Sequence, residues 1–303
     1  KNNLKIFFIL ADARSGSTFL ANDIMKKLGI LIIPETNFVI RLLTAKQSIL
    51  NSEISLVNFL FEEKKFHDLK IKKKELLNNL KNIYSVKKII LTILGIYYKK
   101  NNGRKLYIGI NKGYLYYIDK IMNLFPNSKI INIIRDSRAV YNSKKNSIYS
   151  LSGKPLDLNP YNSAKVWNEK VDIIFKTKKK YSALIFYYED IIKNLNLKVI
   201  QISKFLDLEI PKKNFLNKPK GYYVSKIYHE QLHSNIDLPP RVEKIDKWKR
   251  KLLSHEVFCI EFLTKRKLEE FNYKLVNEKK NFKNYFFLCI FYIKYLLSNF
   301  SKF

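Results

Sequence analysis

The residues from Ala11 to Thr18 have the types and the spacing of an anion-binding loop. They read Ala-Asp-Ala-Arg-Ser-Gly-Ser-Thr and follow five consecutive apolar residues, Ile6–Leu10. Small side chains and one glycine let backbone N–H groups approach a ligand closely, and a helix beginning after the loop would add its positive end. The sequence therefore predicts a cradle for a phosphate or sulfate group. Its predicted members are Arg14, Ser15, Gly16, Ser17 and Thr18.

This loop departs from the Walker pattern G-x-x-x-x-G-K-[ST] at two positions. Ala11 stands where the pattern has its first glycine, and Ser17 stands where it has the lysine. A nucleotide triphosphatase without that lysine is poorly equipped for its reaction. Arg14 is the one cation inside the loop, and a guanidinium can hold a phosphate or sulfate as a bidentate fork.

A second predicted strand-to-helix junction reads Ile-Arg-Asp-Ser-Arg-Ala-Val-Tyr-Asn-Ser at residues 134–143. Together with the first loop, and in the same order along the chain, it resembles the sulfotransferases that use 3′-phosphoadenosine-5′-phosphosulfate (PAPS). The resemblance implies that the first loop holds the 5′-phosphosulfate, and that Arg135 and Ser143 hold the 3′-phosphate. It also implies an α/β fold of three layers, doubly wound around a central parallel sheet, with a P-loop-like architecture.

The resemblance implies two more catalytic residues beside Arg14. Glu35 follows the second predicted strand, at the sheet edge where ligands bind in open α/β folds, and in the family a carboxylate there commonly serves as base. The alternative is an acidic residue that favours a helix N-terminus. Lys112, in Asn-Lys-Gly, resembles a lysine of the tyrosylprotein sulfotransferases and their bacterial relatives that contacts the sulfonate. The alternative is a surface lysine in a loop.

Other parts of the nucleotide site are implied further along the chain. Tyr188 follows a predicted strand at 182–187, and the resemblance places it near the adenine, where an aromatic face can stack on a purine. Simple packing is the alternative. One cation of the run Lys249-Arg250-Lys251 is a candidate contact of the 3′-phosphate, and the sequence does not choose among the three.

These residues imply an in-line transfer of a sulfuryl group to a hydroxyl. Glu35 would accept the proton of the acceptor, while Lys112, Arg14 and the loop amides would meet the charge that develops on the leaving group. No metal is expected, because the arginine and the lysine take the electrostatic role that magnesium has in kinases. The expected acceptor is a saccharide, a protein tyrosine or a small metabolite, and nucleic acid is not expected as a partner.

The chain has 303 residues, of which 47% are hydrophobic. That length and content exclude a disordered chain and favour one large domain. We expect a sulfotransferase domain over residues 1–275, with a lysine-rich helical insertion at 44–102 where the resemblance is weak. A helical tail at 276–303 would follow, both apolar and basic.

Fifty-seven lysines and arginines against 26 acidic residues give a net charge of +31. This charge indicates an anionic partner, or else a bias of the coding sequence toward lysine. The tail either packs on the domain as a last helix or lies on a membrane surface. We expect a cytoplasmic protein, with membrane association through the tail or through a removed upstream anchor as alternatives.

Two other functions are compatible with the sequence. In a kinase or nucleotide triphosphatase, Asp136 would bind the metal, but the missing loop lysine and the neighbouring Arg135 argue against this. A basic protein that binds anions or nucleic acid without catalysis would not need Glu35. Its binding would fall steeply with salt and would not respond to free nucleotide.

Overall fold

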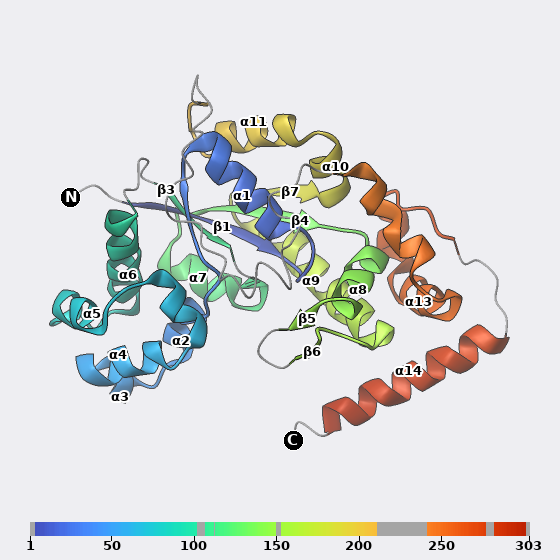
Figure 1. The fold of residues 1–303 in the computed structure, drawn as a ribbon, viewed down its shortest axis with the longest axis horizontal. Coiled ribbons are helices and arrows are strands. Elements are labelled where there is room, and N and C mark those ends of the chain that lie inside the picture. Colours follow the sequence, from blue (N-terminus) through green and yellow to red (C-terminus); the bar gives the residue numbers. More distant parts are fainter. Residues whose placement is uncertain are drawn as a thin grey trace.

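The computed structural model describes residues 4–101, 107–111, 113–149, 153–210, 241–276 and 282–300. Its centre is a five-stranded sheet in the order β2-β3-β1-β4-β7, and all neighbouring strands are parallel (Figure 1). The strands are β1 (Lys5–Ala11), β2 (Leu31–Ile33), β3 (Tyr107–Asn111), β4 (Lys129–Ile134) and β7 (Ala183–Tyr187). β1 lies in the middle, so the loop that follows it opens at the centre of the sheet edge.

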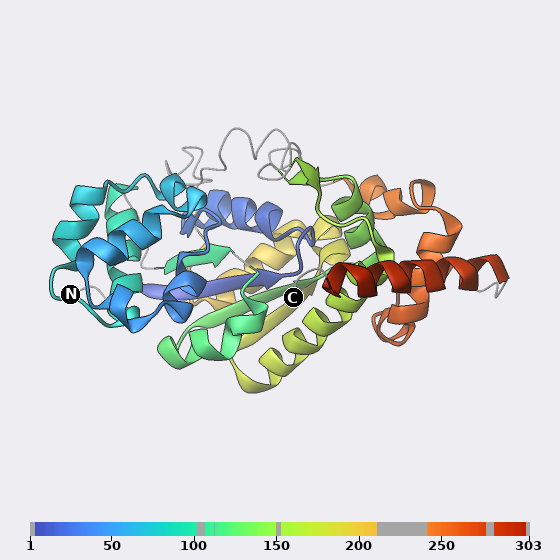
Figure 2. The ribbon, with the colours of Figure 1, turned by 90° about the horizontal axis from the view of Figure 1, so that it is seen from below.

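Helices cover both faces of this sheet, which confirms the predicted α/β architecture (Figure 2). Successive side chains of a strand point to opposite faces, and β1 is apolar and buried from Ile6 to Ala11, as expected for a strand covered on both faces. One face is covered by α1 (Ser17–Leu28), α10 (Tyr188–Lys193) and α11 (Leu195–Phe205). The other is covered by α2 (Phe38–Thr44), α6 (Val86–Lys100), α7 (Ile118–Leu124) and α9 (Pro160–Lys180).

The insertion and the C-terminal part contribute further helices beyond the sheet layers. Before α6 come α3 (Gln47–Leu50), α4 (Glu53–Phe61), a 3₁₀ helix η1 (Lys64–Leu69) and α5 (Lys73–Leu80). Beyond the sheet on the other side lie α8 (Ser137–Lys145), η3 (Val242–Arg250), α13 (Ser254–Glu270) and α14 (Phe282–Phe300). A short η2 (Leu115–Tyr117) precedes α7, and the strands β5 (Ile148–Tyr149) and β6 (Lys154–Pro155) form a small antiparallel pair.

Local signals explain the ends of the principal helices. Gly29 adopts a left-handed conformation (φ 63°) after α1, and its N–H closes the helix on the Met25 carbonyl. The Asn159 side chain accepts hydrogen bonds from the first amides of α9, and Pro160 occupies a first-turn position that needs no N–H donor. Trp167 on α9 is 1% exposed and belongs to the core.

Two helices that follow strands of the sheet end early. The helix α8 ends at Lys145, because the chain turns there into the β5–β6 pair. The helix α10 is separated from α11 at Asn194, whose backbone is not helical (φ −134°, ψ 45°).

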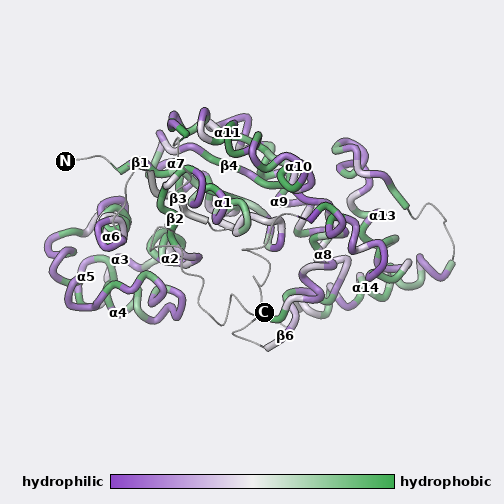
Figure 3. The backbone as a smooth tube through the Cα atoms, turned by 45° about the horizontal axis from the view of Figure 1, so that its top comes forward, coloured by the Kyte–Doolittle hydropathy of each residue, from purple (hydrophilic) through white to green (hydrophobic). Residues whose placement is uncertain are grey.

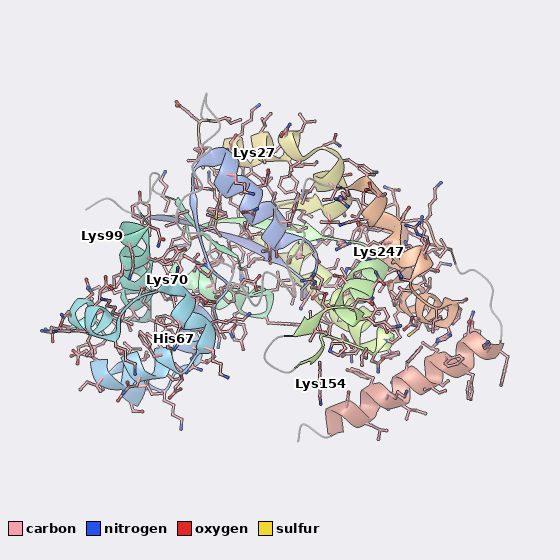
Figure 4. All side chains as sticks on the ribbon, in the orientation of Figure 1. Lys27, His67, Lys70, Lys99, Lys154 and Lys247 are labelled. Atoms are coloured by element: carbon pink, nitrogen blue, oxygen red, sulfur yellow. The ribbon has the colours of Figure 1, made fainter. Side chains whose placement is uncertain are left out.

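Lysine side chains project from elements far apart in the fold, as the labelled Lys27 on α1, Lys99 on α6 and Lys247 on η3 illustrate (Figure 4). The positive charge of the chain is therefore spread over its surface. A spread charge of this kind attracts anions in general and does not by itself point to one binding site.

Candidate active site

The loop between β1 and α1 is a tight turn that aims backbone amides at one point. Ser15 N–H donates to the Asp12 carbonyl at 3.2 Å, and both Arg14 (φ 70°) and Gly16 (φ 90°) have left-handed backbones. Gly16 is the N-cap of α1 and offers no side chain to its first amides. Since those amides have no partner within the helix, the loop and the helix end form a site suited to an anion.

Gly16 is required here for its conformation and for its size. A Cβ atom built on Gly16 would lie only 2.4 Å from Cδ2 of Tyr188. Tyr188 begins α10 directly after β7, so the end of a strand at the sheet edge brings its ring against the loop. The guanidinium carbon of Arg135 lies 4.2 Å from the centre of the same ring, a cation–π distance.

The two sequence motifs meet through Arg14. Its Nε donates to Ser143 Oγ on α8 at 3.1 Å, and its carbonyl oxygen accepts a hydrogen bond from Arg135 Nη1 at 2.9 Å. The structure thus brings together four of the predicted residues, Arg14, Arg135, Ser143 and Tyr188, although they come from three separate parts of the chain. β1, β4 and β7 are neighbours in the sheet, and their C-terminal ends explain this meeting.

Two guanidinium groups lie next to each other at this point. Burial lowers the pKa of Arg14, and the positive charge of Arg135 lowers it further, while Glu35 and Tyr188 act in the opposite direction. Arginine remains charged at neutral pH even so. Both side chains are half-buried. An anion that enters between two like charges of this kind stabilises both of them, so the electrostatics of the site favour an anionic ligand.

Some polar atoms at this site have no protein partner among the described residues. The Oγ atom of Ser15 and the Nε atom of Arg135 are both buried without a hydrogen bond, and Ser15 is 1% exposed. A buried polar atom left unpaired costs about 1–3 kcal/mol. Oxygen atoms of a bound phosphate or sulfate group would provide the missing acceptors.

Glu35 faces the loop from the end of β2. Its Oε1 lies 3.4 Å from Thr18 Oγ1, which donates to it, and its negative charge acts on Arg14. The carboxylate is partly exposed, so a substrate can reach it. Hydrogen bonds at a catalytic group are often long before substrate binds, and the arrangement suits a base beside the anion cradle.

Asp12 anchors the loop, a role that the sequence did not reveal. Its carboxylate is buried and accepts from Lys144 Nζ on α8 at 2.7 Å and from Lys170 Nζ on α9 at 2.6 Å. Burial alone would raise the pKa of Asp12, but the two lysines outweigh it and hold the pKa below its usual value. Because Lys144 follows Ser143, the ion pair ties the loop to the helix that supplies the partner of Arg14.

The second motif is held by its own buried network. Both carboxylate oxygens of Asp136 accept from Arg138, at 2.9 Å and 2.7 Å, and Arg138 also pairs with Glu261 and lies 4.1 Å from the centre of the Trp248 ring. Glu189 accepts from the Asp136 amide at 3.2 Å. Asp136 therefore caps α8 and pairs with Arg138, and its oxygens are not directed to a metal ion.

The other residues predicted for the site lie partly outside the cluster formed by Arg14, Arg135, Ser143 and Tyr188. Lys112 lies outside the described residues. Lys249, Arg250 and Lys251 are exposed on and just after η3, and Lys249 pairs with Asp246 at 2.9 Å. Gly16, Ser17 and Thr18 occupy the cap and first turn of α1. In the part of the chain that the structure describes, no cluster of three or more histidine, cysteine or acidic side chains could hold a metal ion.

Comparison with known proteins places these features in context. The model of the Sulfotransferase family matches residues 7–212. The chain is 27% identical over 137 residues to a protein-tyrosine sulfotransferase of Drosophila melanogaster, and 28% identical over 137 residues to protein-tyrosine sulfotransferase 2 of Gallus gallus. Each alignment covers 42% of this chain, but only 27% and 36% of those two proteins.

Solved structures share the fold over most of the chain. The sulfotransferase domain of the curacin biosynthetic pathway has a TM-score of 0.59 at 21% identity, and covers 90% of this chain and 99% of its own. The sulfotransferase domain of the Synechococcus PCC 7002 olefin synthase has a TM-score of 0.62 at 20% identity, and covers 90% and 97%.

Proposed function

The chain belongs to the sulfotransferase family, and from this premise we propose that it transfers the sulfuryl group of PAPS to a hydroxyl group. One observation carries the proposal: Arg14, Arg135 and Ser143 meet at the N-terminus of α1. PAPS carries a 5′-phosphosulfate and a 3′-phosphate, so a site for it needs cations and amides from more than one loop.

The residues of the site suit distinct parts of this substrate. The amides of Ser15–Thr18, with Arg14, would hold the phosphosulfate at the positive end of α1. Arg135 and Ser143 would hold the 3′-phosphate, with Arg135 oriented by the ring of Tyr188. The unpaired Oγ of Ser15 and Nε of Arg135 would gain hydrogen-bond partners from oxygen atoms of the nucleotide.

The reaction is a displacement at sulfur in which the acceptor oxygen forms a bond as the bridging oxygen of PAPS leaves. Glu35 would accept the hydroxyl proton of the acceptor, and Arg14 would meet the negative charge that builds on the leaving oxygen. Lys112 is proposed to add positive charge at the sulfuryl group. The residues described supply this charge stabilisation through guanidinium and amide groups, so the proposed step needs no metal.

The acceptor is proposed to be a peptide tyrosine, a saccharide or a small metabolite. Similarity to two protein-tyrosine sulfotransferases over 137 residues supports a tyrosine. The two sulfotransferase domains of solved structure are only 20–21% identical to this chain. At that identity they support the fold, and a shared fold does not select an acceptor.

A kinase or nucleotide triphosphatase is the less favoured alternative. Its metal would need Asp136, whose two oxygens are engaged by Arg138, and its loop would need a lysine where Ser17 stands. A non-catalytic anion-binding protein is also less favoured, since Glu35 beside the cradle would repel an anion without serving any purpose.

Transfer of radiolabelled sulfur from PAPS to a panel of acceptors tests the proposal. The panel holds a tyrosine peptide, a polysaccharide and a small phenol, and each reaction is run beside Arg266→Ala, an exposed arginine on α13, as a matched control for Arg135→Ala. We expect label in at least one acceptor with the parent chain and with Arg266→Ala, and loss of labelling with Arg135→Ala. Phosphate transfer from ATP with no consumption of PAPS would contradict the proposal.

A further inference from the structure

Among the residues that the structure describes, α9 and α13 contact one face of the helix α14. His255 on α13 stacks on Phe287 with ring centres 4.0 Å apart, and Tyr161 on α9 lies 5.3 Å from the ring of Tyr295. The Asn159 side chain donates to the Phe291 carbonyl at 2.9 Å. These contacts fix the rotation of α14 about its axis, so the opposite face of the helix is held toward the solvent.

That opposite face is apolar and open to solvent. The exposed fractions are 86% for Phe282, 54% for Phe286, 53% for Ile293 and 64% for Leu297, and Cys289 between them is exposed as well. Their spacing of three, four or seven residues places all of them on one stripe of a helix. Figure 3 shows hydrophobic stretches along α14 at the periphery of the molecule. A continuous exposed stripe of this length indicates an interaction surface.

The polar residues beside this stripe have the charge and the chemistry that suit a lipid surface. Lys283 and Lys294 are exposed along one border, and Tyr285 and Tyr292 are exposed along the other. α14 contains no acidic residue. Lysines attract anionic head groups, and tyrosines favour the boundary between apolar and aqueous regions.

The charge of the protein also favours one of the two candidate partners of the stripe, a second copy of the chain or a membrane. A second copy of the chain would bring together two proteins that each carry a net charge of +31, and the like charges would oppose association. An anionic bilayer has the complementary charge. Among the described helices, none combines the length and the hydrophobicity needed to cross a membrane.

We propose that the outward face of α14 binds to the surface of an anionic membrane. The stripe of Phe282, Phe286, Ile293 and Leu297 enters the boundary between head groups and acyl chains, and the two lysines contact the head groups. The helix lies parallel to the surface, because its inner face stays packed on α9 and α13. This inference does not depend on the proposed sulfuryl transfer.

Sedimentation of the full chain with lipid vesicles tests the proposal. The probes are vesicles of phosphatidylcholine alone and of phosphatidylcholine mixed with phosphatidylglycerol. The test variant is Phe286→Ser/Ile293→Ser. Its matched control is Ile54→Ser/Leu197→Ser, which removes two side chains that are 65% and 59% exposed on α4 and α11. Circular dichroism checks that both variants fold.

We expect binding to the anionic vesicles, roughly tenfold weaker for each apolar residue removed from the stripe and unchanged in the control. A second variant, Lys283→Gln/Lys294→Gln, alters no apolar packing. It should lose about fivefold per lysine on anionic vesicles and show no change on neutral ones. It keeps the test valid if the first variant does not fold.

Three results would overturn the proposal. They are absence of binding to anionic vesicles, equal binding by the Phe286→Ser/Ile293→Ser variant, and a dimer of the parent chain that this variant converts to a monomer. The last result would assign the stripe to a second copy of the chain.

Discussion

Replacement of Gly16 by alanine tests the contact that joins the first loop to Tyr188. The left-handed backbone of Gly16 (φ 90°) costs any other residue about 1–2 kcal/mol. The new Cβ would also lie 2.4 Å from the Tyr188 ring, so the ring must move. Movement of the ring would break its cation–π contact with Arg135, which is worth about 0.5–1 kcal/mol at an exposed site.

The expected total is a loss of about 1.5–3 kcal/mol in the free energy of unfolding, measured by chemical denaturation. Gly153→Ala is the matched control, because Gly153 is also left-handed (φ 64°) but has no atom within 4 Å of a built Cβ. It should lose only the backbone part, about 1–2 kcal/mol. Gly16→Ala should also weaken binding of 3′,5′-diphosphoadenosine by roughly tenfold or more, equivalent to about 1.4 kcal/mol.

The contact with Tyr188 can be isolated by a double-mutant cycle. In a Tyr188→Ala background the ring is absent, so the cost of Gly16→Ala should fall to that of Gly153→Ala. Equal costs for Gly16→Ala and Gly153→Ala in the parent chain, with unchanged nucleotide binding, would refute the reasoning that the ring packs against the cradle.

Substitutions of Glu35, Asp12 and Gly95 test three other parts of the molecule. Glu35→Gln should lower the turnover of sulfuryl transfer by roughly 10²–10⁴-fold while leaving the affinity for 3′,5′-diphosphoadenosine unchanged, and near-normal turnover would remove Glu35 as the base. Asp12→Asn should destabilise the fold by about 3–5 kcal/mol at neutral pH, since it leaves Lys144 and Lys170 without their buried partner. Because the pKa of Asp12 is lowered in the folded protein, the ionised carboxylate stabilises the fold above about pH 3.9, and this stabilisation is lost as the pH falls through the folded pKa. The difference in the free energy of unfolding between the parent chain and Asp12→Asn should therefore shrink in acid. A difference that does not change with pH would contradict this. Gly95→Ala should raise the free energy of unfolding by about 0.5–1 kcal/mol, because Gly95 lies inside α6 and a built Cβ meets no atom within 4 Å; a loss of stability would contradict it.

The parallel sheet and the tight turn between β1 and α1 were predictable because their signals are contiguous in the sequence. A buried strand followed by small residues and a helix occurs within residues 6–20, and a second such junction occurs within 130–143. Parallel neighbours in a sheet bring their C-terminal ends to one edge. The meeting of Arg14 with Arg135 and Ser143 therefore agrees with the arrangement that the two motifs imply.

Partners contributed by distant helices were not predictable. Lys170 reaches Asp12 from 158 residues away, and no local pattern identifies a lysine of α9 as the partner of a buried carboxylate. The contact of Tyr188 with Gly16 and Arg135 depends on a side-chain rotamer, which sequence spacing does not determine. The role of Tyr188 toward an adenine ring stays a prediction.

The tail shows a different limit of sequence reasoning. Its residues are apolar on several sides, so periodicity alone does not distinguish packing from exposure. Contacts of His255 and Tyr161 determine which face of α14 is buried. The structure was needed to show that the helix both packs on the protein and presents a second apolar face.

The central claim is a site for the nucleotide of PAPS, and thermal unfolding with added nucleotide tests it most directly. The ligands are 3′,5′-diphosphoadenosine and, separately, ATP with magnesium. A ligand at 100 times its dissociation constant stabilises a fold by about 2.7 kcal/mol, which a melting curve resolves. We predict stabilisation by 3′,5′-diphosphoadenosine that is lost in Arg135→Ala and kept in Arg266→Ala. Stabilisation by ATP with magnesium alone would contradict the account.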